Sequence, residues 1–221
     1  MNLRLSDVKL AFLVLAIVAG FSLKGRQAHA VESEILTVAG GCFWCVEADF
    51  ERVAGVSEVV SGYTGGTTTN PTYKQVTRGG TGHYEAVQII FDPDRVSRAD
   101  LLSLFLRSVD PTDAGGQFCD RGESYRTAIF VSDQAERQLA EAAIAEARAV
   151  LGQKIVTPVL AEAQFYEAED YHQDYYKGTN RVITRFGAIA QTDAYKRYRE
   201  GCGRDQRVRQ LWGNQAPFVG G

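Results

Sequence analysis

The run Gly40-Gly41-Cys42-Phe43-Trp44-Cys45 constrains the fold of this chain more than any other feature. The residues before it, 35–39, are apolar and mostly β-branched, which predicts a strand. Two glycines then break that strand, and residues 46–52 are expected to begin a helix. Cys42 is therefore predicted to lie at a strand-to-helix turn. Backbone N–H groups at a helix N-terminus stabilise negative charge, so we expect this thiol to favour its nucleophilic thiolate form.

Two bulky aromatic residues, Phe43 and Trp44, directly follow Cys42. They would place an apolar wall beside a nucleophile, which suits an apolar group attached to a reactive centre. The alternative interpretation of these residues is a buried cysteine in a packed aromatic core.

Residues 1–30 are expected to be a secretory signal peptide outside the folded domain. Arg4 and Lys9 precede an apolar run at 10–21, and Ala28-His29-Ala30 offers small residues at the spacing of a signal-peptidase site. The apolar run is too short for a comfortable membrane span. Cleavage predicts an exported protein, periplasmic or extracellular, that begins near Val31. An uncleaved anchor, a lipoprotein and a buried N-terminal helix are the alternatives.

Charge and length limit the remaining possibilities. The formal net charge of the 221 residues is −3, and the expected signal carries more basic than acidic residues, so the remainder is more acidic still. No basic stripe is left, which argues against nucleic acid as a partner. We expect one domain at 31–221, large enough for one substantial core, with a C-terminal tail from about residue 195.

The chain has four cysteines, Cys42, Cys45, Cys119 and Cys202. In an oxidising compartment an even number can mean two structural disulfides. A Cys-x-x-Cys pair such as Cys42 and Cys45 is more often redox-active or metal-binding. Zinc is disfavoured because no further ligands stand at a recognisable spacing, and only His83 and His172 follow the signal.

Alternating patterns and turn residues predict the other elements. Strands are expected at 56–63, 85–91, 126–131 and 156–160. Helices are expected after Ser97 and over 133–151, with a short helix within 168–176. Long loops are expected at 64–82 and 110–122, and the stretch after residue 195 is polar. This mixture favours an α+β fold with helices largely on one face of a sheet.

Several ordered motifs carry a resemblance to a known family. They are Gly41-Cys42-Phe43-Trp44, Gly62-Tyr63-Thr64-Gly65-Gly66, Asn70-Pro71-Thr72-Tyr73, Thr81-Gly82-His83-Tyr84-Glu85, Asp110-Pro111-Thr112, Asp120-Arg121-Gly122, Tyr125-Arg126 and Ala168-Glu169-Asp170-Tyr171-His172-Gln173. Together, over about residues 36–213, they resemble the type A peptide methionine sulfoxide reductases. The resemblance implies a two-layer α+β sandwich, a ferredoxin-like plait with a mixed sheet and an extended C-terminal tail.

The same resemblance implies a role for each residue of the site. Cys42 is the nucleophile, Phe43 and Trp44 form the pocket for the substrate methyl group, Tyr73 and Tyr125 hydrogen-bond the sulfoxide oxygen, Glu85 is the acid, and Asp120 organises the site. A carboxyl in an apolar pocket tends to stay protonated, so Glu85 could donate a proton to the leaving oxygen. Ordinary alternatives are a core aromatic for Phe43, a solvated strand-end acid for Glu85 and a turn residue for Asp120.

The implied reaction is thiol-dependent reduction of S-methionine sulfoxide, free or peptide-bound, and hence repair of oxidised proteins. Cys42 becomes a sulfenic acid, a second thiol condenses with it to a disulfide, and a thioredoxin-type dithiol protein reduces that disulfide. No metal or organic cofactor is expected to take part.

The identity of the second thiol stays open. Most family members have glycine in place of Cys45, and many have asparagine in place of Cys119. Cys202 is favoured, because the glycines beside it ease backbone movement and the family commonly uses a C-terminal cysteine. Cys45 is the next candidate, and Cys119 is a minor one or a relay.

Two other functions remain. The first is a thioredoxin-like disulfide oxidoreductase using Cys42 and Cys45, although that class usually has its aromatic residue before the first cysteine. The second is an exported binding module stapled by Cys42–Cys45 and Cys119–Cys202 disulfides.

Overall fold

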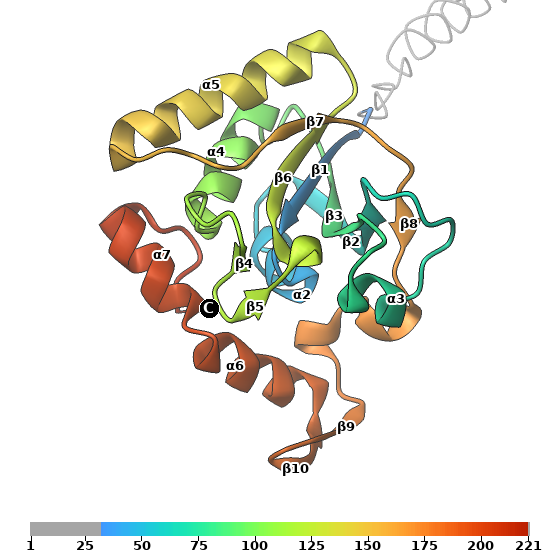
Figure 1. Ribbon diagram of the computed structural model, residues 1–221. Helices are drawn as coiled ribbons and strands as arrows, with labels where there is room; N and C mark the ends of the chain where they lie inside the picture. Colours follow the sequence, from blue (N-terminus) through green and yellow to red (C-terminus); the bar gives the residue numbers. More distant parts are fainter. Residues whose placement is uncertain (1–31, 221) are drawn as a thin grey trace, which may run out of the picture. The chain divides into compact units, whose positions relative to one another are not determined.

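The computed structural model describes residues 32–220 (Figure 1). The predicted signal peptide and its cleavage site therefore lie outside the described residues. Within the described part of the chain, no helix has both the length and the apolar character needed to cross a membrane.

A six-stranded mixed sheet forms the centre of the fold, in the order β7-β6-β1-β3-β2-β8. Its strands are β1 (Glu34–Gly40), β2 (Val56–Thr64), β3 (Tyr84–Phe91), β6 (Thr127–Val131), β7 (Val159–Ala161) and β8 (Tyr166–Glu167). Val38 of β1 lies opposite Val87 of β3 on one side and Ile129 of β6 on the other. All neighbours are antiparallel except β6 and β7. The one parallel pair makes the sheet mixed, as expected.

Four of these strands form a ferredoxin-like plait. Helix α2 (Phe43–Phe50) connects β1 to β2, and α4 (Arg98–Ser108) follows β3 on the way to β6. The resulting order β6-β1-β3-β2 is wholly antiparallel. The predicted α+β plait is therefore confirmed.

The main core lies between one face of the sheet and helices α2, α4 and α5 (Gln134–Leu151). Its buried members include Leu36, Val38, Phe50, Val87, Ile89, Leu101, Phe105, Ile129 and Ala140. The other face carries a smaller cluster, Ala39, Tyr84, Ala86, Ala128 and Phe130. Figure 1 shows α4 and α5 side by side, and α5 contacts β6. Helices thus cover mainly one face, as the sequence predicted.

Local capping explains where the helices begin. The Ser97 hydroxyl accepts the Asp100 N–H, and the Asp133 carboxylate accepts the Glu136 N–H. Helix α3 (Tyr73–Arg78) was not expected, because it lies in the predicted loop 64–82. Its signal is the capping box at its N-terminus, in which the Thr72 hydroxyl accepts the Gln75 N–H and the Gln75 side chain accepts the Thr72 N–H.

The C-terminal segment is helical. Helix α6 (Gln191–Gly201) and helix α7 (Arg204–Trp212) follow a hairpin of β9 (Arg181–Thr184) and β10 (Gly187–Ala190). Val208 and Trp212 of α7 are members of the main core. In place of the one short helix expected within 168–176, the chain forms two 3-10 turns, Asp170–His172 and Tyr175–Lys177.

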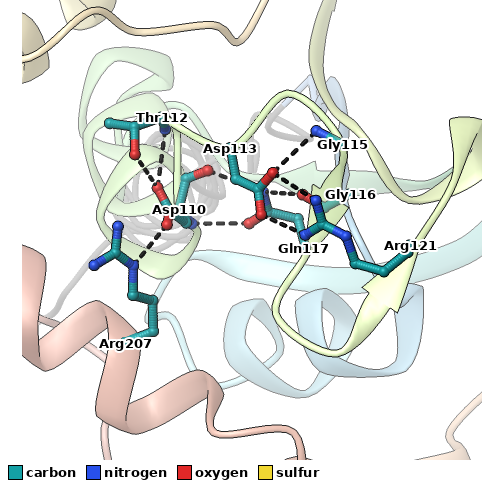
Figure 2. A network of polar contacts seen from close by, with 8 residues as sticks. All are labelled: Asp110, Thr112, Asp113, Gly115, Gly116, Gln117, Arg121 and Arg207. Atoms are coloured by element: carbon teal, nitrogen blue, oxygen red, sulfur yellow. Dashed lines mark hydrogen bonds and ion pairs between the residues drawn. The ribbon is translucent and has the colours of Figure 1, made fainter.

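Polar contacts fix the predicted loop at 110–122 (Figure 2). The loop contains a minimal hairpin of β4 (Gly116–Gln117) and β5 (Asp120–Arg121). The Gln117 side chain accepts the N–H of Asp110 at 2.8 Å, and Arg207 of α7 donates to the Asp110 carboxylate at 2.7 Å. The loop is thus held by its own amide groups and by α7, which sets the position of Asp120.

Candidate functional site

Cys42 lies at the strand-to-helix turn, as predicted. Gly41 has φ +79°, and a Cβ there would lie 2.5 Å from Cβ of Gln117, so glycine is required. The carbonyl of Cys42 already accepts the N–H groups of Cys45 at 3.1 Å and Val46 at 3.4 Å. Helix α2 therefore begins at Phe43, three residues earlier than expected, and Cys42 is its N-cap residue.

A small cavity of about 50 Å³ opens at this turn. Its lining consists of Cys42, Phe43, Trp44, Tyr73, Glu85, Asp120, Tyr125 and Tyr198. All but Tyr198 were predicted from the sequence. These seven residues come from the start of α2, from α3 and β3, from the loop at 110–122 and from the 3-10 turn Glu123–Tyr125. The fold thus brings together predicted residues that are up to 83 positions apart in the chain.

Glu85 is the buried acid of this cavity. Its side chain is 1% exposed, which rules out a solvated strand-end role. One carboxyl oxygen, Oε2, accepts the N–H of Phe43 at 3.2 Å, and Oε1 has no hydrogen-bond partner within residues 32–220. Burial raises the pKa of Glu85 to about 8, although the Phe43 N–H opposes this. The carboxyl therefore carries a proton at neutral pH.

Tyr73 and Tyr125 place phenol groups at the same cavity. Burial raises the pKa of both, so they remain hydrogen-bond donors at any physiological pH. The N–H of Tyr73 donates to Glu169 at 3.0 Å, and the same carboxylate accepts the hydroxyl of Tyr63 at 2.9 Å. Glu169 thus fixes the start of α3 against β2.

Tyr198 is the lining residue that the sequence did not predict. Its hydroxyl donates to the Asp120 carboxylate, and burial raises the pKa of Asp120. Tyr198 belongs to α6, in a stretch whose polar composition predicted only a tail. No motif or spacing marks it, because only the packing of α6 brings it to the cavity.

Trp44 is held by aromatic contacts. Its ring stacks on Tyr175 with centroids 3.8 Å apart, and its indole N–H donates to Nδ1 of His172 at 3.1 Å. Burial lowers the pKa of His172 to about 4, so the imidazole stays neutral and Nδ1 can accept. Phe43 is 1% exposed and belongs to the main core, so it is both a core residue and part of the cavity wall.

Cys42 and Cys45 are free, buried and in contact. Burial raises the pKa of Cys42, which contradicts the expected thiolate at the helix N-terminus. The loss of water around the sulfur, together with the neighbouring Cys45 thiol, outweighs the favourable helix end. The pKa of Cys45 is lowered by its hydrogen bond with Cys42 and by the charges of buried arginines. Of the two thiols, Cys45 is therefore the one that ionises more readily.

Cys119 and Cys202 form a disulfide. Cys202 is the C-cap residue of α6, between two helices, and the expected flexible tail is wrong at this position. Cys202 therefore has no free thiol to offer Cys42 in this state. An open hollow of about 440 Å³ beside the disulfide is lined by Cys119 and Cys202 and in part by Phe186 and Tyr198, and the side chains predicted to act on the substrate with Cys42 lie outside it.

The family model for peptide methionine sulfoxide reductase matches residues 34–214. The chain belongs to the peptide methionine sulfoxide reductase family. Among the curated relatives of this reductase, MsrA 2 of Rhizobium meliloti is 48% identical over 86% of this chain and 88% of its own length. MsrA of Bacillus subtilis is 48% identical over 82% of this chain and 97% of its own length.

Solved structures agree with this family assignment. Methionine sulfoxide reductase A of Corynebacterium diphtheriae is 30% identical and has a TM-score of 0.59, covering 70% of this chain and 77% of that one. Mxr1 of Saccharomyces cerevisiae in reduced form is 28% identical, with a TM-score of 0.62 over 70% and 90% of the two chains. The plait fold of this reductase is thus a family property, and a thioredoxin-like oxidoreductase is not favoured.

Proposed function

We propose that this reductase converts the S epimer of methionine sulfoxide, free or within peptides and proteins, to methionine and so repairs oxidised proteins. The observation that carries the proposal is a thiol, a protonated carboxyl and two phenols at one aromatic cavity. A sulfoxide has a polar oxygen and an apolar methyl group on one sulfur. The phenols of Tyr73 and Tyr125 suit the oxygen, and the rings of Phe43 and Trp44 suit the methyl group.

The first step transfers oxygen to the enzyme. The sulfur of Cys42 attacks the sulfoxide sulfur, and Glu85 gives its proton to the oxygen. The proton of the Cys42 thiol replaces the one that Glu85 has lost. Oxygen ends on Cys42 as a sulfenic acid, and methionine leaves. Cys42 is oxidised, the substrate sulfur is reduced, and no proton is gained or lost overall.

The second step closes a disulfide between Cys42 and Cys45. Cys45 supports this assignment because it is free, touches Cys42 and has a lowered pKa, whereas Cys202 is already bonded to Cys119. We therefore propose Cys45 as the resolving cysteine, in place of Cys202, the residue that the sequence had favoured. A thioredoxin-type dithiol protein would then restore both thiols by exchange.

Export is part of the same proposal. The basic start, the apolar run at 10–21 and Ala28-His29-Ala30 support a signal that is cleaved near Val31. N-terminal sequencing of the protein from its native host tests this directly. Recovery of the intact chain beginning at Met1 from the cytosol would contradict export.

A single-turnover experiment tests the reaction. The chain, with Cys42 and Cys45 reduced, is mixed with one equivalent of S or R methionine sulfoxide, and the products and disulfides are mapped by mass. We expect one methionine per chain from the S epimer, none from the R epimer, and a new Cys42–Cys45 disulfide.

Two serine variants are the controls. Cys42→Ser should form no methionine while keeping the native circular dichroism spectrum. Cys45→Ser should form one methionine and then stop as a sulfenic acid. Near wild-type single-turnover activity in Cys42→Ser would exclude Cys42 as the nucleophile.

A further inference from the structure

A cluster of buried charges lies where α2 packs against the C-terminal helices. Asp49 is one helical turn after Cys45 and therefore on the same face of α2. Its carboxylate contacts Arg199 of α6 at 2.8 Å and Arg204 of α7 at 3.8 Å. Cys45 itself packs against Tyr195 of α6. The face of α2 that carries Cys45 is thus covered by arginine-bearing helices.

Arg199 is well matched within this cluster. Its guanidinium donates to Asp49 at 2.8 Å, to Asp205 at 2.9 Å, to the Tyr195 hydroxyl at 3.0 Å and to the Phe218 carbonyl at 3.1 Å. These contacts account for its burial by ordinary pairing.

Arg204 is not matched in this way. It is 2% exposed, and its only hydrogen bond within residues 32–220 is a long one, 3.4 Å, to the Gly40 carbonyl. Nε and Nη2 have no hydrogen-bond partner in the described part of the chain. The guanidinium lies 4.8 Å from the ring centroid of Phe118. A buried cation with unused donors is costly, so a negative charge that forms beside it is stabilised.

The ionisable groups around Cys45 come from each element that packs against it. They are Cys42 and Asp49 of α2, Glu85 of β3, Tyr175 of the 3-10 turn after His172, Tyr195, Tyr198 and Arg199 of α6, and Arg204 of α7. Glu85 and the tyrosines are neutral at pH 7. Asp49 lies between Arg199 and Arg204, and Arg199 also pairs with Asp205. Within the described residues, Arg204 is therefore the cation of this set that has unused N–H donors.

We propose that Arg204 is a positioning residue for the second half of the reaction, holding Cys45 as the thiolate that attacks the Cys42 sulfenic acid. The inference rests on the proposed function, with Cys45 as the resolving thiol. In this step the S–S bond forms and the S–O bond of Cys42 breaks. Cys45 supplies the electron pair and is oxidised, while the Cys42 sulfur is reduced. The oxygen leaves with its own proton and one more from solvent, as water.

The test separates the two half-reactions in the full chain. Methionine release and disulfide formation are each followed after mixing with one equivalent of S-methionine sulfoxide, across a range of pH. Arg204→Gln should release methionine at nearly the wild-type rate. Its disulfide should form about tenfold more slowly at neutral pH, with the midpoint of the pH profile moved upward, because one unit in a thiol pKa changes the thiolate fraction about tenfold.

Two further arginine variants complete the series. Arg204→Lys keeps the charge and should restore most of the rate and the midpoint. Arg209→Gln, on an exposed position of the same helix, should behave as wild type. A purely structural role would instead slow both half-reactions and leave the midpoint unchanged, which would overturn the proposal.

A second measurement applies if Arg204→Gln does not fold. Thiolate absorbance in Cys42→Ser, with the Cys119–Cys202 disulfide intact, reports the ionisation of Cys45 alone. We expect a midpoint below the ordinary value of about 8.5, and a midpoint at or above it would overturn the proposal. Wild type that forms methionine but joins Cys42 to another cysteine would refute the Arg204 role and leave the proposed function intact. No methionine from wild type would refute both.

Discussion

Cys42 and Cys45 are three residues apart, yet their surroundings shift the pKa values of their thiols in opposite directions. The pKa of Cys42 is raised and that of Cys45 is lowered. The cavity side holds Cys42 among a neutral acid and aromatic rings, and the helix side holds Cys45 near arginines. A protonated Cys42 does not prevent attack, because its proton can pass to Glu85 as oxygen is transferred. This division lets one short helix carry two thiols with different tasks.

Glu85→Gln tests the acid at the residue scale. Glutamine keeps the shape of the side chain but cannot give up a carboxyl proton, so methionine release should slow by about 10²-fold or more. Because the pKa of Glu85 is raised to about 8, the wild-type rate of methionine release should be level below that pH and fall above it. Rapid-quench measurement at several pH values checks both expectations.

The matched control for this acid is Glu58→Gln, since Glu58 is exposed on β2. It should leave the rate and the pH profile unchanged. An equal rate of sulfenic acid formation in Glu85→Gln would remove Glu85 from the mechanism.

Most of the residues at the site could be predicted from the sequence because short motifs carry them. Cys42, Phe43 and Trp44 are contiguous, and Glu85 and Asp120 lie in recognisable runs. Tyr198 could not be found, since its hydrogen bond to Asp120 exists only once α6 has packed. The thiol ionisation was also mispredicted, because burial and distant arginines are properties of the folded molecule.

At the scale of elements, the turn between β1 and α2 sets the position of the nucleophile. Gly41→Ala should destabilise the protein by about 1–3 kcal/mol, because the residue has a positive φ and its Cβ would press on Gln117. Gln117 in turn holds Asp110, so the loop that carries Asp120 should shift as well. Chemical denaturation measures the stability, and methionine release measures the site.

Gly152→Ala is a suitable comparison for that turn. Gly152 also has a positive φ, of 63°, but a Cβ there meets nothing within 4 Å. It should cost less stability and leave methionine release unchanged. Equal losses in the two variants would show that close packing at Gln117 has no part in the effect.

The disulfide ties α6 to the loop at 110–122 across a sequence separation of 83 residues. The double variant Cys119→Ser/Cys202→Ser should lose about 2–5 kcal/mol of stability, since the unfolded chain is no longer constrained. It should still release one methionine and should still be recycled by a dithiol protein. If recycling stops while the single turnover persists, Cys202 takes part in electron transfer, as its sequence context first suggested.

The fold was predictable wherever periodicity was strong. The four central strands and α5 follow clear alternation or amphipathic patterns, and Ser97 and Asp133 mark helix starts. Helix α3 was missed because glycine, threonine and proline around it indicate a loop. Helices α6 and α7 were missed because most of their residues are polar. The few residues that enter the core, such as Val208 and Trp212, are too sparse to give a clear apolar period.

At the scale of the whole molecule, buried acids make stability depend on pH. Glu47 is 1% exposed, and burial raises its pKa to about 7. The pKa of Glu47 in the folded protein lies above its value in the unfolded chain. Its contribution to the free energy of unfolding is therefore complete below about pH 4.5 and is lost as the pH rises through about 7. Glu85 acts in the same direction up to about 8. The free energy of unfolding should therefore fall from mildly acid to mildly alkaline pH.

Glu47→Gln should remove part of this dependence. Its amide oxygen can accept the Asp174 N–H and its NH₂ can donate to the Ser61 hydroxyl, so both existing contacts are retained. Above pH 7 the variant should be more stable than wild type by about 1–3 kcal/mol, with little difference near pH 4.5. Urea denaturation at the two pH values decides the matter, and a constant difference between the proteins would show that Glu47 does not titrate in this range.

Residues 204–218 are part of the interior of the domain. Phe218 meets the ring of Phe50 with centroids 5.5 Å apart, and Arg204, Val208 and Trp212 are buried among residues from the first half of the chain. A chain that lacked residues 204–218 would therefore leave the main core incomplete. The C-terminal helices are therefore required for the core of this domain to close.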